Sequence, residues 1–171
     1  MQMVKRTIGG FFLLVLLMWI LAPKHELYYL LEKELKKQGV VISNETIENN
    51  WFGVTLTNAN ISVKGIQFAT VKELNLNLFF LYNALTVKSI NIDESLQNMA
   101  PKTIDRLNIV YSIMNPLAVQ IDSNGSFGIA NGTVDPIERH VKILFPVAKD
   151  INTFKKFLKK DASGWYYETN Y

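Results

Sequence analysis

Cysteine is absent from the 171-residue sequence, and histidine occurs only twice. Without cysteine the chain can form no disulfide framework, no cysteine metal site and no thiol nucleophile. The two histidines, His25 and His140, lie far apart in the sequence, and neither has a second histidine at ligand spacing. We therefore expect no metal site, and we expect stability to come from packing alone.

A strong charge of either sign is also missing. The 18 lysines and arginines are interspersed with 15 acidic residues, and the net charge of +3 gives no basic patch for nucleic acid. No Gly-x-Ser-x-Gly motif is present, and the adjacent carboxylates Asp93 and Glu94 lie in a predicted connection. These patterns predict a protein with no catalytic residue and no cofactor. A small envelope enzyme remains an alternative, which mutation of His140 and Asp135 would test.

An apolar run at residues 8–22 follows Lys5 and Arg6, and this pattern predicts a membrane-targeting segment. At about 1.5 Å per residue, a helix of this length spans about 22 Å, whereas a complete span takes about 20 residues. A cleaved signal peptide has the same layout, but no A-x-A pattern is present and Pro23 follows the candidate small residue. We favour an uncleaved anchor, with a cleaved signal or a buried core helix as alternatives. The anchor residues are Ile8, Phe11, Phe12, Leu13, Leu14, Val15, Leu16, Leu17, Trp19, Ile20 and Leu21.

The positive-inside rule predicts the topology of this anchor. It places Lys5 and Arg6 in the cytoplasm and the rest of the chain outside it. In a bacterium this arrangement is a single-pass inner-membrane protein whose N-terminus is cytoplasmic and whose main domain is periplasmic. The expected organisation is an anchor at residues 1–22, a stem helix at 23–39 and a periplasmic β-rich domain at 40–171.

Leucines at helical spacing predict the stem helix. Leu27, Leu31 and Leu35 recur every four residues, Leu30 fills the same stripe, and Gly39 supplies a stop signal. The helix is expected either to continue the anchor outward or to pack onto the sheet that follows.

From Val40 onward, apolar residues alternate with polar or small ones, which predicts antiparallel strands with one buried and one wet face. The alternating runs include residues 54–56, 61–63, 66–68, 74–80, 85–87, 90–92, 107–113, 117–121, 127–129 and 141–145. Asn, Asp and Gly predict turns at residues 58–60, 64–65, 122–125 and 131–132. The runs at 85–87 and 90–92 are one residue out of phase, which predicts a bulge or a bend near Lys88 and Ser89.

The C-terminal region is expected to contain a helix and a closing segment. Ile151, Phe154, Phe157 and Leu158 form an apolar face at helical spacing within residues 147–160. Trp165, Tyr166, Tyr167 and Tyr171 are a candidate protein interface, because Trp and Tyr are favoured anchors there; alternatively, this tail completes the sheet. The predicted fold class is α+β, with a single N-terminal transmembrane helix, a bent antiparallel meander, one stem helix and one C-terminal helix.

Residues 122–126 contain an N-x-S sequon on a predicted exposed turn, which makes Asn124 a candidate glycosylation site. Asp122 stands two positions before the asparagine, as in the extended sequon of bacterial oligosaccharyl transferases. The alternative is that Asp, Asn, Gly and Ser are present here only as turn-forming residues.

Several segments resemble the AsmA-type repeat, which recurs in the type II secretion system protein N family. The resemblance is carried by residues 53–63, 68–76 and 85–92, and by the spacing of Gly125, Gly128, Gly132 and Val134. The family also has a single N-terminal anchor, a leucine-rich helix and a strand of the form G-V-x-L-x-N. The resemblance covers most of the chain, which is shorter than typical members and so implies a single sheet module. It implies a bitopic inner-membrane protein with a periplasmic β-rich domain.

Larger AsmA-type relatives are associated with lipid carriage along an apolar groove in a curled sheet. By that resemblance Leu76, Leu78 and Phe80 are candidate lipid-facing residues, and the alternative is that they belong to an ordinary core. An apolar face and a bend near Lys88 and Ser89 are the two features that such a groove requires.

The leading functional hypothesis is a non-enzymatic scaffold subunit of an envelope-spanning machine, either a type II secretion-like apparatus or a flagellar-motor periplasmic scaffold. Its expected partners are the inner membrane, other proteins of the machine and its own copies in a homo-oligomer or ring. An open meander edge can pair with a neighbour's strand through main-chain hydrogen bonds. The alternative hypothesis is lipid or lipoprotein handling through an apolar groove, with lipid as the ligand. No nucleic-acid partner is expected.

Overall fold

A computed structural model describes residues 2–21, 24–79, 81–162 and 164–171. Within these ranges two helices, α1 (Gln2–Leu21) and α2 (Lys24–Lys37), precede eleven strands. The strands are β1 (Val40–Ser43), β2 (Thr46–Asn50), β3 (Gly53–Val63), β4 (Ile66–Phe79), β5 (Tyr82–Ile92), β6 (Thr103–Ser112), β7 (Asn115–Gly125), β8 (Gly128–Asp135), β9 (His140–Ala148), β10 (Lys159–Asp161) and β11 (Gly164–Asn170). Two short 3-10 helices, η1 (Glu94–Leu96) and η2 (Lys155–Phe157), lie in connections.

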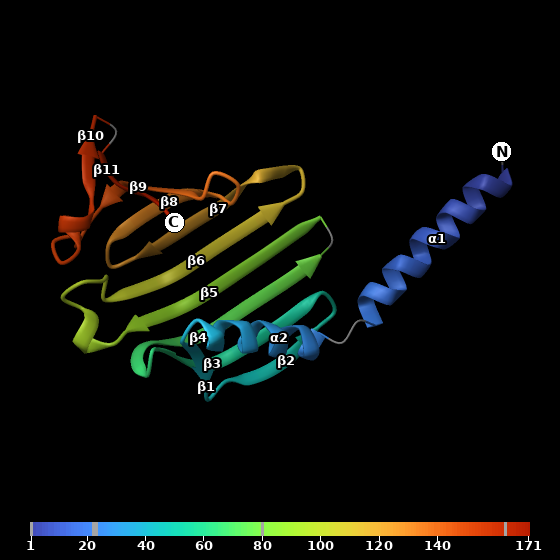
Figure 1. Cartoon of the computed structure of the whole chain (residues 1–171), viewed down its shortest axis with the longest axis horizontal. Coiled ribbons are helices and arrows are strands. Elements are labelled where there is room, and N and C mark those ends of the chain that lie inside the picture. The colour runs from blue at the N-terminus through green and yellow to red at the C-terminus, as the bar shows by residue number, and fades with distance from the viewer. Residues whose placement is uncertain (1, 22–23, 80, 163) are drawn as a thin grey trace.

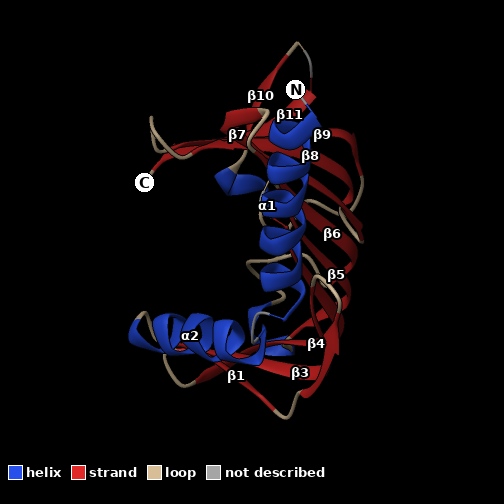
Figure 2. Ribbon diagram, turned by 90° about the vertical axis from the view of Figure 1, so that its right-hand side faces the viewer, coloured by secondary structure: helices blue, strands red, loops and turns tan. Residues whose placement is uncertain are grey.

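The strands form one antiparallel 11-stranded sheet in the order β1-β3-β4-β5-β6-β7-β8-β9-β11-β10, with β2 also paired to β3. From β3 to β9 each strand lies beside the next one in the sequence, so this part is an uninterrupted meander (Figure 1). In the rotated view the sheet curls into an open C, with α2 along its lower arm (Figure 2). The predicted fold, mostly an antiparallel sheet with few helices, is confirmed.

Several strands are longer than the alternating runs predicted. Asn58 lies within β3, and Asn131 and Gly132 lie within β8, although turns were expected at all three. The turn at residues 64–65 is confirmed, and Gly65 adopts a φ of 82° there. Turn-forming residues inside the strands therefore mark local irregularities of long strands and not their ends.

A line of irregular residues crosses the sheet at one level. Asn58 and Ser89 adopt left-handed φ angles of 57° and 54°. The pairing of β3 with β4 passes over Asn58, and the pairing of β4 with β5 passes over Ser89. Both pairings also pass over Lys72, the residue opposite, so the register of the strands does not shift at this level. The apolar side chains change phase here, from Val87 to Ile90 in β5, and stay on the same face of the sheet. A local irregularity is therefore present near Lys88 and Ser89, as predicted, but without the register shift of a bulge.

The inner face of the C carries three apolar clusters. Their buried members are Tyr28, Val54 and Leu56 at the α2 end; Ala59, Ala69, Val71, Val87, Ile90 and Ile92 in the middle; and Phe127, Ala130, Ile151 and Phe154 at the C-terminal end. Leu74 packs against the first two clusters and Ile104 against the last two, so the apolar face is continuous.

Helix α2 covers the first strands through one buried residue. Tyr28 is only 2% exposed, and its hydroxyl donates a 2.9 Å hydrogen bond to Oε1 of Glu45. The predicted stem helix is present and stops at Gly39, whose φ is 82°. Leu27 and Leu31 of the leucine stripe stay exposed, so tyrosine and not leucine anchors the helix to the sheet.

Because Tyr28 is buried, the stability of the protein varies with pH in the alkaline range. Burial, and then the hydrogen bond to Glu45, raise the pKa of Tyr28 above its usual 10.0. Above pH 10 the unfolded chain loses a proton that the folded chain keeps, so the stabilisation present below pH 10 is lost progressively as the pH rises. We expect the free energy of unfolding to fall by up to about 1.4 kcal/mol per pH unit from this group.

Urea unfolding of the wild type and of Tyr28→Phe between pH 8 and pH 11 measures this dependence. The other tyrosines and the lysines titrate in both proteins, so the difference between the two curves isolates Tyr28. A difference in unfolding free energy that stays constant over this range would contradict the prediction.

The C-terminal helix predicted at residues 147–160 is wrong. Strand β9 continues to Ala148, which pairs with Gly128, and only the three-residue η2 is helical between there and β10. Ile151 and Phe154 are nonetheless buried against the sheet, as their apolar character indicated. Strand pairing takes the two ends of the segment into β9 and β10, and the residues between them form turns and η2.

The tail completes the sheet, which was the second of the two alternatives. Trp165, Tyr166 and Tyr167 lie half-buried in β11, paired with β9 on one side and β10 on the other. Trp165 packs against the cluster of Phe127 and Phe154. Tyr171 remains 61% exposed, so it alone of the four stands well into solvent.

Helix α1 stands clear of the sheet (Figure 1). Large apolar side chains on it are exposed, namely Phe11, Leu13, Leu14, Leu17, Met18 and Leu21, whereas Val15 and Leu16 are half-exposed. The side chains of Ile8, Phe12, Trp19 and Ile20, and residues 22–23, lie outside the described part of the chain. Among the helices described, none is both long and apolar enough for a complete membrane crossing.

Candidate functional site

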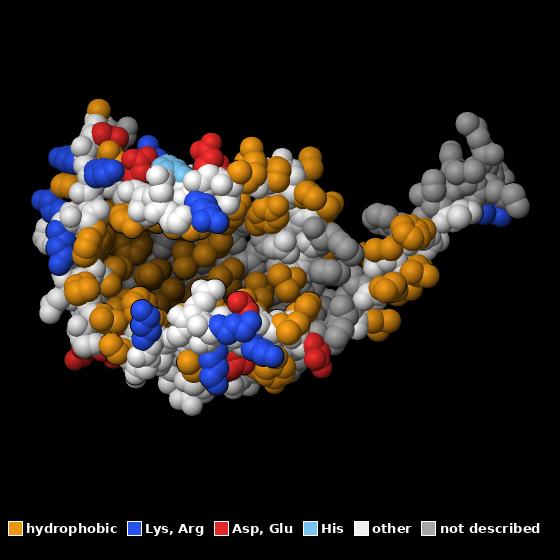
Figure 3. Space-filling view, in the orientation of Figure 1, with side chains coloured by type: hydrophobic (Ala, Val, Ile, Leu, Met, Phe, Trp, Pro, Cys, Tyr) orange, Lys and Arg blue, Asp and Glu red, His pale blue; other side chains and the backbone are white. Residues whose placement is uncertain are grey.

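An apolar groove runs along the inner face of the sheet and deepens into a pocket near its C-terminal end. The pocket has a volume of about 310 Å³, close to the lower limit for small-molecule sites. It is lined by Met99, Ala100, Pro101, Leu107, Ile121, Ser123, Phe127, Ala130, Ile143, Phe145, Phe154, Phe157, Leu158 and Tyr167. The space-filling view shows this hollow lined by hydrophobic side chains, between polar and charged rims (Figure 3).

Cross-strand register explains why these side chains converge. Ile121 stands opposite Gly132, which stands opposite Ile143, which stands opposite Tyr167. Residues directly opposite each other in an antiparallel sheet share a face, so β7, β9 and β11 present their apolar side chains together. Because Gly132 has no side chain, the row is open in the middle, and this gap helps to form the hollow.

Aromatic side chains close the end of the groove. Phe145 contacts Phe127 edge-on and Phe154 at a tilt, each with ring centroids 6.0 Å apart. The ring of Phe127 lies on the β7–β8 turn, and Phe154 lies just before η2. Packed rings thus lie at this end of the groove, whereas among the described residues no second sheet faces its middle.

The chemistry of the lining is almost wholly apolar. No charged side chain contributes to the pocket, and among its lining only Ser123 and Tyr167 carry side-chain oxygens. The Ser123 hydroxyl already donates a 3.1 Å hydrogen bond to the carbonyl of Arg106. Such a site offers burial to an apolar ligand and little to a polar one, because an unpaired polar group would lose its water without compensation.

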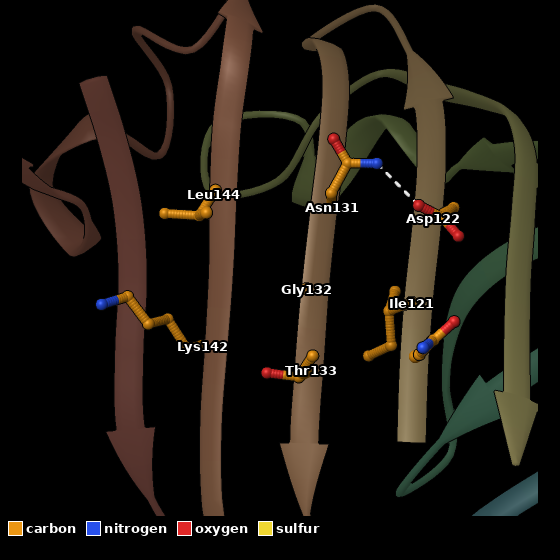
Figure 4. A pocket seen from close by; sticks show the side chains of 8 residues that line it. Ile121, Asp122, Asn131, Gly132, Thr133, Lys142 and Leu144 are labelled. Carbon is orange, nitrogen blue, oxygen red and sulfur yellow. Dashed lines mark hydrogen bonds between the residues drawn. The ribbon is translucent and has the colours of Figure 1, made fainter. Parts of the chain in front are cut away.

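The outer face of the same strands is polar. An open depression of about 260 Å³ lies there, bordered by Asp122, Asn131, Thr133, Lys142 and Leu144 among others (Figure 4). Asn131 donates a 2.6 Å hydrogen bond from Nδ2 to Oδ1 of Asp122. Its shallowness and its internally paired polar groups are typical of a solvated sheet surface.

A hydrogen-bonded ladder continues this polar face across β3, β4 and β5. The Thr55 hydroxyl donates to Asn75 at 2.6 Å, Asn75 donates to Glu73, and Lys88 donates to the same carboxylate at 2.7 Å. The hydrogen bond from Lys88, followed by that from Asn75, lowers the pKa of Glu73. Polar side chains on the outside and apolar ones on the inside establish which face is available to an apolar ligand.

The three residues that were predicted to face lipid do not share one environment in the structure. Leu76 packs against the cluster of Tyr28 and Leu56 and so belongs to the core beneath α2. Leu78 shares its face and is half-buried, and Phe80 lies outside the described residues. Sequence reasoning missed the pocket itself, although the alternation of Ile121 and Ile143 with polar neighbours indicated their shared face.

The remaining candidate residues lie on the outer surface. Asn124 is exposed, but it lies within β7 and not on the predicted turn, because pairing with Ile129 extends the strand. His140 opens β9, as expected, with Nε2 3.3 Å from Oε1 of Glu168. Asp135 accepts hydrogen bonds from the backbone N–H groups of Ile137 and Glu138, a turn role. Over the described ranges, no cluster of metal-ligating side chains is present.

These features define the class of protein as an open, curled antiparallel sheet with an apolar concave face. No family model, curated protein or solved structure matches the chain.

Proposed function

We propose that the protein binds the acyl chains of a membrane lipid in the groove on the inner face of its sheet. The observation that carries this proposal is the pocket between Ile121, Ile143 and Phe154, which is apolar, hollow and open along one side. Each methylene group buried there would contribute about 0.8 kcal/mol, so the affinity should rise with the number of methylenes that the groove covers. We thus prefer lipid handling through an apolar groove to the hypothesis of a scaffold subunit.

Helix α1 complements the groove as the attachment to the membrane. Its exposed apolar residues, such as Phe11 and Met18, are not covered by any described part of the chain, and a bilayer would bury them. With Lys5 and Arg6 at its start, we place the N-terminus in the cytoplasm and the sheet in the periplasm of a bacterium. A lipid carrier tethered in this way needs no catalytic residue and no cofactor.

Fewer observations support the hypothesis of a scaffold subunit than support lipid binding. Strand β10, at one edge of the sheet, is only three residues long and consists of Lys159, Lys160 and Asp161. Short, charged edge strands resist the addition of a neighbour's strand. The AsmA-type resemblance of residues 53–63 and 85–92 fits the lipid hypothesis equally well.

A photoactivatable palmitic acid with a diazirine near its methyl end tests the proposal. The full chain, purified in mild detergent, is illuminated with the probe and digested, and the adducts are located by mass spectrometry. We expect adducts on residues that line only the inner pocket, such as Ile143 and Phe154. Adducts confined to the outer face, or no adduct on the sheet, would refute lipid binding in the groove.

Two neighbouring residues of β9 provide a matched pair of variants. Ile143 lines the pocket, whereas Leu144 borders the outer depression. We expect Ile143→Asp to reduce probe incorporation about tenfold and Leu144→Asp to leave it unchanged. Because a buried aspartate destabilises the sheet, Ser123→Phe, which fills the hollow without adding charge, should also reduce incorporation while the melting temperature is maintained. Equal incorporation in all of these variants would contradict the proposal.

A further inference from the structure

Three turns at one end of the sheet expose large apolar side chains. The β2–β3 turn carries Trp51, which is 75% exposed, and the β6–β7 turn carries Met114, which is 88% exposed. Between them, Leu81 of the β4–β5 connection and Tyr82, the first residue of β5, are each about half exposed. Exposed apolar groups that cluster in this way mark an interaction surface, unlike single ones scattered over a protein.

Backbone hydrogen bonds join the three turns into one continuous rim. The Leu78 N–H donates to the carbonyl of Phe52 at 2.7 Å, and the Ile113 N–H donates to the carbonyl of Leu81 at 2.9 Å. The ring of Phe52 also packs edge-on against that of Phe79, with centroids 5.5 Å apart. We call these three turns, at residues 51–52, 81–82 and 113–114, the apolar rim.

Charged residues are absent from this end of strands β3 to β7, whereas the β8–β9 turn at the same end carries Glu138 and Arg139. The sequence contains no Asp, Glu, Lys or Arg between Glu48 and Lys64, between Glu73 and Lys88, or between Arg106 and Asp122. The turns at the opposite end are different, since they include Lys64, the acidic pair Asp93 and Glu94, and the pair Lys149 and Asp150. Along strands β3 to β7, the two ends of the sheet therefore differ sharply in polarity.

The apolar rim also lies at the end from which α1 departs. Strands β4 and β6 point toward the side of the molecule where α1 stands (Figure 1). Whatever binds the rim must therefore accept uncharged aromatic and aliphatic side chains, and it must lie close to the apolar helix α1. A bilayer surface meets these requirements, because Trp and Tyr are favoured at the lipid–water interface.

We propose that the apolar rim inserts into the membrane surface and directs the open end of the groove toward the bilayer. Trp51 and Tyr82 lie at the headgroup level, whereas Met114 and Ile113 reach the upper acyl region. The turns enter the membrane interface to a depth of about 5–10 Å, as interfacial segments do. This docking goes beyond acyl-chain binding and does not depend on it, because the rim and the pocket share no residue.

The absence of cysteine allows a direct test. A single environment-sensitive label is attached to Met114→Cys in the full chain, which is reconstituted into phosphatidylcholine–phosphatidylglycerol vesicles. Gln67→Cys, at the opposite end of the sheet on exposed β4, is the control. We expect the Met114→Cys label to show a blue-shifted emission and to be quenched by lipids with spin labels on their acyl chains. The Gln67→Cys label should show neither effect.

Other results would overturn the docking. Emission from Met114→Cys that resembles emission in water places the rim in solvent, and a blue shift without quenching by lipid places it against protein. Repeating the measurement with Ile143→Asp separates the two proposals. Quenching that persists in this variant supports the rim even if acyl-chain binding fails.

Discussion

Replacing Gly128 with alanine is expected to destabilise the protein by about 4 kcal/mol, which lowers the melting temperature by roughly 10 °C. Gly128 has a φ of 96°, where a side chain alone costs about 1–3 kcal/mol. A Cβ atom there would also lie 1.8 Å from the carbonyl oxygen of Val147, so strands β8 and β9 would have to separate. The same shift would disturb Phe127, which closes the groove.

Gly65→Ala is the matched control for this prediction. Gly65 has a similar φ of 82°, but an added Cβ would meet nothing within 4 Å. We expect a loss of only about 1 kcal/mol from backbone strain. Thermal unfolding followed by circular dichroism measures both variants. Equal losses would show that crowding against β9 contributes nothing.

The second large effect is expected at Tyr28. Tyr28→Ala removes a buried aromatic ring between α2 and the cluster of Val54 and Leu56, which we expect to cost about 3–5 kcal/mol. The helix should then detach, because the other residues on its surface, including Leu30, are largely exposed. Amide hydrogen exchange measures the detachment directly, as a loss of protection confined to α2 and its neighbours.

The adjacent Tyr29 tests whether burial or residue type decides how much stability is lost when a tyrosine of α2 is replaced by alanine. Its ring is 5.7 Å from that of Tyr28 but is 53% exposed, so Tyr29→Ala should cost less than about 1 kcal/mol. Tyr28→Phe keeps the ring and loses only the hydrogen bond to Glu45, with an expected cost of about 1 kcal/mol. Full protection of α2 in Tyr28→Ala would show that another contact anchors the helix.

Periodicity in the sequence was enough to predict an antiparallel sheet with one apolar face. Alternation places Leu107, Ile121 and Ile143 on that face whatever the strand order, and the phase break near Ser89 indicated the irregularity that is found there. Strand ends were harder to predict, because Asn131 and Gly132 suit a turn as well as a strand irregularity. The choice between the two depends on pairing with distant β9, which no local signal reports.

The groove could be predicted only in part for the same reason. Ile151 and Phe154 have the spacing of a helix, but the pairing of β9 with β8 extends through Ala148 and leaves the segment folded as turns. Whether an apolar face is a core or an open groove depends on whether another layer covers it. That property belongs to the whole curled sheet and is not encoded in any single strand.

The consecutive order of the strands has a consequence for how the cavity can change in size. Because strands are added side by side around the C, inserting one hairpin would lengthen the arc of the sheet by about 9.6 Å and so widen the bore. The length of the channel, in contrast, follows from the strands themselves, and the 11 residues of β3, β5 and β7 span about 35 Å. Duplication or loss of hairpins could therefore tune the diameter of the channel while its length stays constant.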